Sequence, residues 1–151
     1  RQYFDLLLPA VRDRDVAEVL ALPEVHKRVL RMREQDQAFR EAALAHSRLE
    51  GHVVVTDFRP LEPIPIGNRF LIFTLFPTAT VAVRVQWGPG REKVAVSAGR
   101  SILNRTSRAN LGVLMSVHGG GGHAGAGACL LPAATADARI AEIVSTLERN
   151  G

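Results

Sequence analysis

The sequence predicts an α/β (α+β) protein: a mixed sheet of about five strands flanked by helices, with a long helix towards the N-terminus. Three observations support this prediction. A helical pattern of apolar residues runs from Pro23 to about Glu50, valine-rich runs fill the middle of the chain, and a second helical stripe lies near its end. This order is typical of helices packed on a sheet.

Length and composition suit one globular domain with a core, since the chain has 151 residues, 46% hydrophobic and 23% charged. The net charge of +4 favours anionic partners without establishing nucleic-acid binding. Cys129 is the single cysteine, no signal peptide is apparent, and the apolar runs are too short for a bilayer. We therefore expect a soluble, cytoplasmic protein without a membrane partner.

The N-terminal part is predicted to be helical. Residues 9–22 mix apolar and charged side chains, which indicates a short amphipathic helix or a connector. Pro23 suits a first helical turn, and Gly51 suits the end of the long helix. The apolar stripe of that helix consists of Val25, Val29, Met32, Phe39 and Ala43.

The middle of the chain is predicted to form four strands, and a fifth follows later. The short Pro77-Thr78 spacing predicts a tight antiparallel hairpin between the second and third strands, and Gly88-Pro89-Gly90 predicts a turn. Helical patterns follow Arg108 and include the final stripe of Ile140, Ile143, Val144 and Leu147. The predicted strands are His52–Phe58, Phe70–Phe76, Ala79–Gln86, Lys93–Ala98 and Ala126–Leu131.

Four consecutive glycines, Gly119, Gly120, Gly121 and Gly122, precede His123. Glycine costs about 0.5–1 kcal/mol relative to alanine in regular structure, so the run indicates a close approach of the backbone to a ligand phosphate. His123 would supply a donor there. For the glycine run, the alternatives are a flexible loop or a corner where a helix packs closely on a strand. For His123, they are a helix cap or a buried, hydrogen-bonded histidine. The element order excludes a dinucleotide fingerprint, and no Gly-Lys-Ser/Thr completes a phosphate loop.

A second group of candidates leaves the fourth strand and enters a helix. Arginine forks, hydroxyls and helix N-terminal amides can together bind phosphate. Arg105 is alternatively a solvated surface charge. Asn104 and Asn110 are alternatively caps of turns or of the following helix. Arg84 lies opposite the valines of its strand, where it lines a cleft or forms a surface ion pair. The predicted substrate-binding side chains are Arg84, Arg100, Ser101, Asn104, Arg105 and Asn110.

These motifs resemble one known family. Gly67-Asn68-Arg69-Phe70, Arg100-Ser101 with Asn110, and the glycine run with His123 look like the DHH phosphoesterases. The resemblance is to their C-terminal DHH-associated domain, in exopolyphosphatase-related and nanoRNase/pAp phosphatase-like proteins. It covers most of residues 23–150. It implies that residues 23–151 are a substrate-binding domain and residues 1–22 a linker from a missing N-terminal catalytic lobe.

The resemblance also implies a function, that of the substrate-binding lobe of a manganese-dependent phosphoesterase. The substrates would be short oligonucleotides, nucleotide phosphates or polyphosphate, with His123 as a donor to the substrate phosphate. The aspartates here form no Asp-His-His triplet, so manganese is expected in the missing lobe and the fragment alone is expected to be inactive. That lobe and a possible homodimer are the expected protein partners. The alternative is a non-catalytic module binding single-stranded or RNA partners, although aromatics are only 5%.

Overall fold

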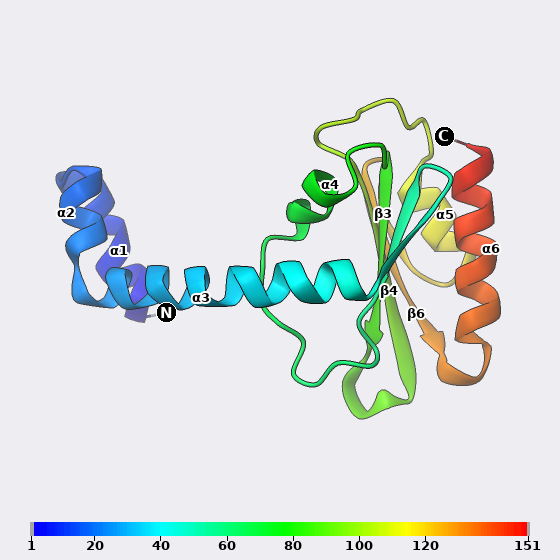
Figure 1. The fold of residues 1–151 in the computed structure, drawn as a ribbon, viewed down its shortest axis with the longest axis horizontal. Helices are drawn as coiled ribbons and strands as arrows, with labels where there is room; N and C mark the ends of the chain where they lie inside the picture. Colours follow the sequence, from blue (N-terminus) through cyan, green and yellow to red (C-terminus); the bar gives the residue numbers. More distant parts are fainter. Residues whose placement is uncertain (1, 151) are drawn as a thin grey trace. The chain divides into compact units, whose positions relative to one another are not determined.

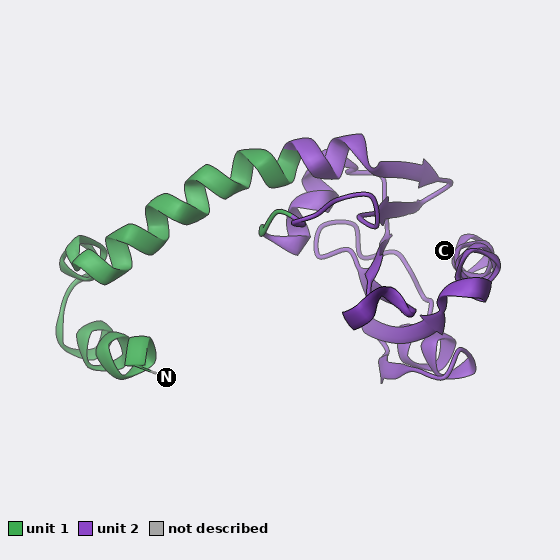
Figure 2. Cartoon of the chain, turned by 90° about the horizontal axis from the view of Figure 1, so that it is seen from below, with its two compact units in different colours: residues 1–40, 65–67 green, residues 41–64, 68–151 purple. Residues whose placement is uncertain are grey.

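A computed structural model describes residues 2–150 of the chain. It divides into two compact units, residues 1–40 with 65–67 and residues 41–64 with 68–151 (Figure 2). Arg1 and Gly151, the outer ends of the two predicted segments, lie outside the described residues. The predicted boundary between residues 22 and 23 stays a prediction.

The first unit is helical. It contains α1 (Gln2–Asp13), α2 (Val16–Ala21) and the larger part of α3 (Pro23–Ala45). Asp15 begins α2 with a capping box, in which its side chain accepts from the Glu18 amide and the Glu18 side chain accepts from the Asp15 amide. The predicted helical start at Pro23 is confirmed, because its missing N–H costs nothing in a first turn.

The second unit is built on a six-stranded mixed sheet in the order β1-β2-β3-β4-β6-β5. β2 and β3 run parallel, and every other neighbouring pair is antiparallel. The predicted mixed sheet is confirmed with one strand more than expected. The strands are β1 (Ser47–Glu50), β2 (Val53–Asp57), β3 (Val81–Trp87), β4 (Lys93–Arg100), β5 (Gly121–His123) and β6 (Ala126–Pro132).

The main core lies between the sheet and two helices, α5 (Leu111–Val117) and α6 (Ala136–Arg149), which cover the same face (Figure 1). Alternate residues of β3 point into it, as the valine spacing predicts. The predicted stripe of α6 packs against them. The buried residues of β3 and α6 that form this core are Val81, Val83, Val85, Ala136, Ile140, Ile143, Val144 and Leu147.

The long helix is shorter than predicted, because α3 ends at Ala45 and Ser47–Glu50 form β1. β1 pairs with β2, and the hydroxyls of Ser47 and Thr56 share a hydrogen bond of 2.7 Å. Gly51 therefore does not close a helix. With φ of 56°, it makes the turn of the β1–β2 hairpin, a conformation that favours glycine.

The predicted strand at Phe70–Phe76 is wrong, and with it the hairpin at Pro77-Thr78. Arg69–Leu71 form a 3-10 turn, η1, that leads into the short helix α4 (Ile72–Leu75). The Asn68 side chain begins this helical segment by accepting from the Phe70 amide at 3.0 Å. The segment therefore belongs to the crossover that joins the parallel strands β2 and β3.

The turn predicted at Gly88-Pro89-Gly90 is confirmed. Pro89–Arg91 form a 3-10 turn, η2, between β3 and β4, and Gly90 has a φ of 70°. A third 3-10 turn, η3 (Ala133–Thr135), joins β6 to α6. The predicted strands at 79–86, 93–98 and 126–131 are confirmed as β3, β4 and β6.

Candidate functional site

The strand register places His123 on the sheet face that α5 does not cover. Gly121 lies opposite Ala128, and His123 lies opposite Ala126. Between these two alanines, Gly127 faces α5, since a Cβ built there would lie 2.6 Å from the Leu111 carbonyl oxygen. Because alternate residues of a strand point to opposite faces, Gly121 and His123 point away from α5.

Arg84 projects from the same face. In the register, Arg84 pairs with Ser97, Ser97 with Ala128, and Ala128 with Gly121, so one row crosses four strands. Most residues in the rows of this face are small, and Ser97 and Ala128 are exposed. We call this surface the open sheet face, and it consists of Ala82, Arg84, Gln86, Ala95, Ser97, Gly99, Gly121, His123, Ala126, Ala128 and Leu130.

The four glycines have different surroundings. Gly119, with φ of 76°, ends α5, where the Gly120 amide donates to the Met115 carbonyl. A Cβ at Gly120 would lie 2.0 Å from the Ala128 carbonyl oxygen, and one at Gly122 would lie 2.3 Å from that of Ala126. A Cβ at Gly121 would meet nothing within 4 Å. Chain packing therefore accounts for Gly120 and Gly122, the positive φ at the end of α5 accounts for Gly119, and Gly121 leaves open space above the sheet.

His123 is exposed and oriented by the turn that follows it. Its Nδ1 accepts a hydrogen bond of 3.2 Å from the Gly125 amide. A neutral ring that accepts at Nδ1 carries its proton on Nε2, which leaves Nε2–H as a donor. His123 can thus donate to an oxygen of a ligand on the open sheet face.

The segment after β4 is held by the side chains that sequence reasoning chose as ligand contacts. The Ser101 hydroxyl accepts from the amides of Leu103 and Asn104 at 3.1 and 3.0 Å. The Arg105 guanidinium donates to the Ile102 carbonyl at 3.1 Å. Asn110 caps α5 by accepting from the Val113 amide at 3.1 Å. These groups shape the loop, and their contact with substrate stays a prediction.

Arg100 lies on the other side of the sheet from His123. It pairs with the core residue Val81, and its Nε donates to the Ala109 carbonyl at 2.9 Å. Its backbone nevertheless joins the two candidate loops, since the Arg100 amide donates to the Gly125 carbonyl at 2.9 Å. The end of β4 and the β5–β6 turn therefore meet, while the Arg100 guanidinium and the His123 ring face opposite sides.

Arg84 is a half-buried cation. Its guanidinium carbon lies 4.9 Å from the centre of the Phe58 ring, and burial lowers the pKa of the guanidinium. Its Nε is buried without a hydrogen-bond partner, as is Oε1 of Gln86, two residues along the same face. Sequence reasoning chose Arg84 but missed Gln86, although the alternation of β3 places both on one face.

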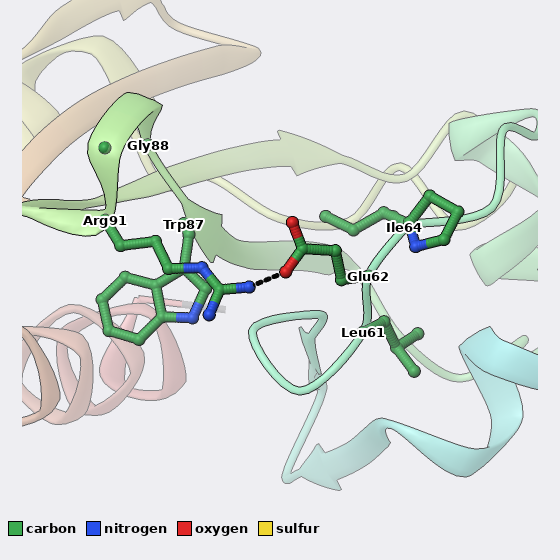
Figure 3. A pocket seen from close by; sticks show the side chains of 8 residues that line it. Leu61, Glu62, Ile64, Trp87, Gly88 and Arg91 are labelled. Carbon is green, nitrogen blue, oxygen red and sulfur yellow. Dashed lines mark hydrogen bonds and ion pairs between the residues drawn. The ribbon is translucent and has the colours of Figure 1, made fainter.

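A hollow of about 610 Å³ lies at the Trp87 end of β3. None of the predicted site residues lines it. Figure 3 shows the ion pair of Glu62 and Arg91 at this hollow, near the Trp87 indole. The indole Nε1 donates to the Arg59 carbonyl at 3.1 Å. The side chain of Trp87 is therefore anchored.

The residues present do not suit a manganese ion. Within residues 2–150, no three histidine, cysteine, aspartate or glutamate side chains gather in a group that could hold a metal. The described part of the chain therefore offers manganese no ligand set of its own. Across the same residues, no helix is both long and apolar enough to cross a membrane.

Comparison with solved structures gives two informative likenesses. The pGpG-specific phosphodiesterase PggH from Vibrio cholerae matches with a TM-score of 0.94 and 31% identity, over 99% of this chain and 51% of that one. The DHH domain of a protein assigned to a family of ribosomal proteins matches with a TM-score of 0.52 and 15% identity, over 85% of this chain and 32% of that one. The second likeness shows the fold alone.

The chain spans about half the length of the phosphodiesterase that it matches. No protein-family model and no curated protein matches the sequence. The likeness to the phosphodiesterase extends over nearly the whole chain in both fold and sequence, and it includes the strands that carry Arg84 and His123. The predicted resemblance to the DHH-associated domain of the DHH phosphoesterases is thereby confirmed.

Proposed function

We propose that this chain is the substrate-binding lobe of a phosphoesterase that acts on short oligonucleotides. The observation that supports this most is the match to a pGpG-specific phosphodiesterase over 99% of the chain at 31% identity. Manganese ions on a separate N-terminal lobe would supply the activated water in such an enzyme. That lobe, the metal and a cytoplasmic location are parts of the proposal.

The residues of this chain would bind and orient the substrate. The Nε2–H of His123 donates to a phosphate oxygen, because Nδ1 is occupied by the Gly125 amide. Gly121 admits the substrate because no side chain fills the space above it. The start of α5 holds the β5–β6 turn in place, because the Leu111 amide donates to the Ala124 carbonyl at 3.1 Å.

Binding of 5′-phosphorylated diguanylate (pGpG) to the chain tests this proposal. We expect His123→Ala to weaken binding by about tenfold or more, the range of one charge-assisted hydrogen bond. Gly121→Val should also weaken it, because its side chain fills the open space. His26→Ala, at an exposed histidine of α3, is the matched control and should bind as the unaltered chain does. Titration calorimetry measures all four affinities.

Equal affinity of His123→Ala and the unaltered chain would remove His123 from the binding site. The activity of the full protein that carries this chain, measured on pGpG, adenosine 3′,5′-bisphosphate and polyphosphate in parallel, identifies the substrate class. A steep loss of affinity with salt would instead favour the alternative, a module that follows many phosphates of a single strand.

A further inference from the structure

The open sheet face contains polar groups that the proposed phosphate contact at His123 does not use. Arg84 forms no ion pair within residues 2–150, and its Nε has no hydrogen-bond partner. Its cross-strand neighbour Thr56 is occupied by the Ser47 hydroxyl. A half-buried cation without an ion pair has lost part of its hydration, and its buried Nε–H without an acceptor is unfavourable unless a ligand supplies one.

Gln86 lies beside Arg84 and has the same deficiency. The two side chains are two residues apart on β3, on one face, and Oε1 of Gln86 is buried without a partner. The face thus combines a donor group and an amide within one patch. The guanidinium carbon lies 4.9 Å from the centre of the Phe58 ring, and this cation–π contact favours one placement of the planar fork.

The surface between Arg84 and His123 is unobstructed. The residues that separate them in the register rows are small, namely Ser97, Gly99, Ala126 and Ala128. β3 and β5 are three strand spacings apart, which is about 14 Å at roughly 4.8 Å per spacing. That span exceeds the reach of one phosphate group and suits a ligand of two nucleotide units lying flat across the strands.

We propose that Arg84, with Gln86, binds the second nucleotide unit of the substrate and so makes the site selective for dinucleotides over single nucleotides. The inference rests on the proposed function and specifies its substrate length. His123 and Gly121 then contact the phosphate between the two units. Arginine planes also stack on bases, so the support by Phe58 suits either a base or a phosphate oxygen of the second unit.

The test compares two ligands that each carry two phosphates. pGpG has two nucleoside units, and guanosine 3′,5′-bisphosphate (pGp) has one. We expect the unaltered chain to bind pGpG more tightly than pGp. Arg84→Met, which keeps an apolar stem over Phe58 but removes the charge, should lower pGpG affinity about tenfold and change pGp affinity less than twofold. Arg84→Lys should restore part of the difference.

Arg139→Met is the matched control, because Arg139 is exposed on α6, which covers the other face of the sheet. It should leave both affinities unchanged. Far-ultraviolet circular dichroism and thermal unfolding check that the Arg84 variants are folded. Should Arg84→Met be unfolded, the two affinities are compared with Arg84→Lys instead.

The outcomes separate the two proposals. Should Arg84→Met and Arg84→Lys leave the ratio of pGpG to pGp affinity unchanged, the role of Arg84 in substrate length is overturned while the proposed function stands. A loss of both affinities in equal measure also overturns it and assigns Arg84 a general anion contact. Failure of the unaltered chain to bind either ligand contradicts the proposed function itself, and the inference with it.

Discussion

At the scale of single residues, Gly120 and Gly121 are adjacent but meet different surroundings. A Cβ at Gly120 would lie 2.0 Å from the Ala128 carbonyl oxygen and 2.6 Å from Cβ of Cys129, whereas a Cβ at Gly121 would meet nothing within 4 Å. Gly120→Ala should destabilise the fold by about 1–3 kcal/mol through overpacking. Gly121→Ala should change the unfolding free energy little. Urea unfolding measures both, and equal losses would contradict this account of the glycine run.

Asp57 gives a residue-scale prediction about pH. Burial raises the pKa of its carboxyl, but hydrogen bonds from the Arg59 side chain and amide outweigh burial and hold that pKa below its ordinary value. A lowered pKa stabilises the folded state above the unfolded value of about 3.9, and this contribution is lost as pH falls through the folded value. Asp57→Asn should therefore cost about 1 kcal/mol at neutral pH and almost nothing in strong acid.

Unfolding free energies from pH 2 to 7 check this prediction. Asp137→Asn is the matched control, because Asp137 also pairs with Arg59 but its side chain is 80% exposed. It should have the smaller effect. A loss of stability for Asp57→Asn that is the same at pH 2 and pH 7 would contradict the assignment.

At the scale of elements, variants of Asn110 can distinguish a helix-capping role from a ligand contact. Its side chain begins α5 by accepting from the Val113 amide. Asn110→Ala should lower the unfolding free energy by about 1 kcal/mol, and Asn110→Asp should retain the cap because its carboxylate accepts equally well. Reduced pGpG affinity in Asn110→Asp at full stability would show that the amide also contacts the ligand. Unfolding and titration calorimetry on the same variants distinguish these roles.

The element scale also shows what the sequence could predict. The alternating valines of β3 and the spacing of Ile140, Ile143, Val144 and Leu147 correspond to buried faces, because periodicity reports burial directly. The apolar run at Phe70–Phe76 has no such period, and a short run of this kind suits a strand or a buried helical turn equally. Ser47–Glu50 became a strand through pairing with β2, a partner that local pattern does not reveal.

The sequence predicted the residue types of the candidate site but not the sheet face on which each side chain lies. The glycine run and His123 stand out as residue types, but their face depends on the register of β5 against β6. Arg100 was chosen for its place at the end of a strand, and its pairing with Val81 turns its guanidinium to the other side. Met32 of the predicted α3 stripe is 65% exposed, because a helix pattern does not reveal which turns find a partner.

At the scale of the whole molecule, the two units differ in how much apolar surface they bury. The buried apolar residues of the first unit are Ala10, Val25 and Phe39, and large side chains such as Phe4 and Val16 are exposed there. The second unit contains the continuous core under α5 and α6. We expect amides of α1 and α2 to exchange with solvent orders of magnitude faster than those of β3 and β4. Hydrogen exchange followed by mass spectrometry measures this, and uniform protection would contradict it.

Both outer strands of the sheet are short. β5 at one edge has three residues, two of them glycine, and β1 at the other has four, with Arg48 and Glu50 paired on it. A flat, long edge is what recruits a neighbouring chain into a growing fibre, and short or charged edges resist this. A concentrated solution of this chain should therefore stay free of cross-β aggregates. Substitutions that lengthen β5 should make such aggregates form more readily.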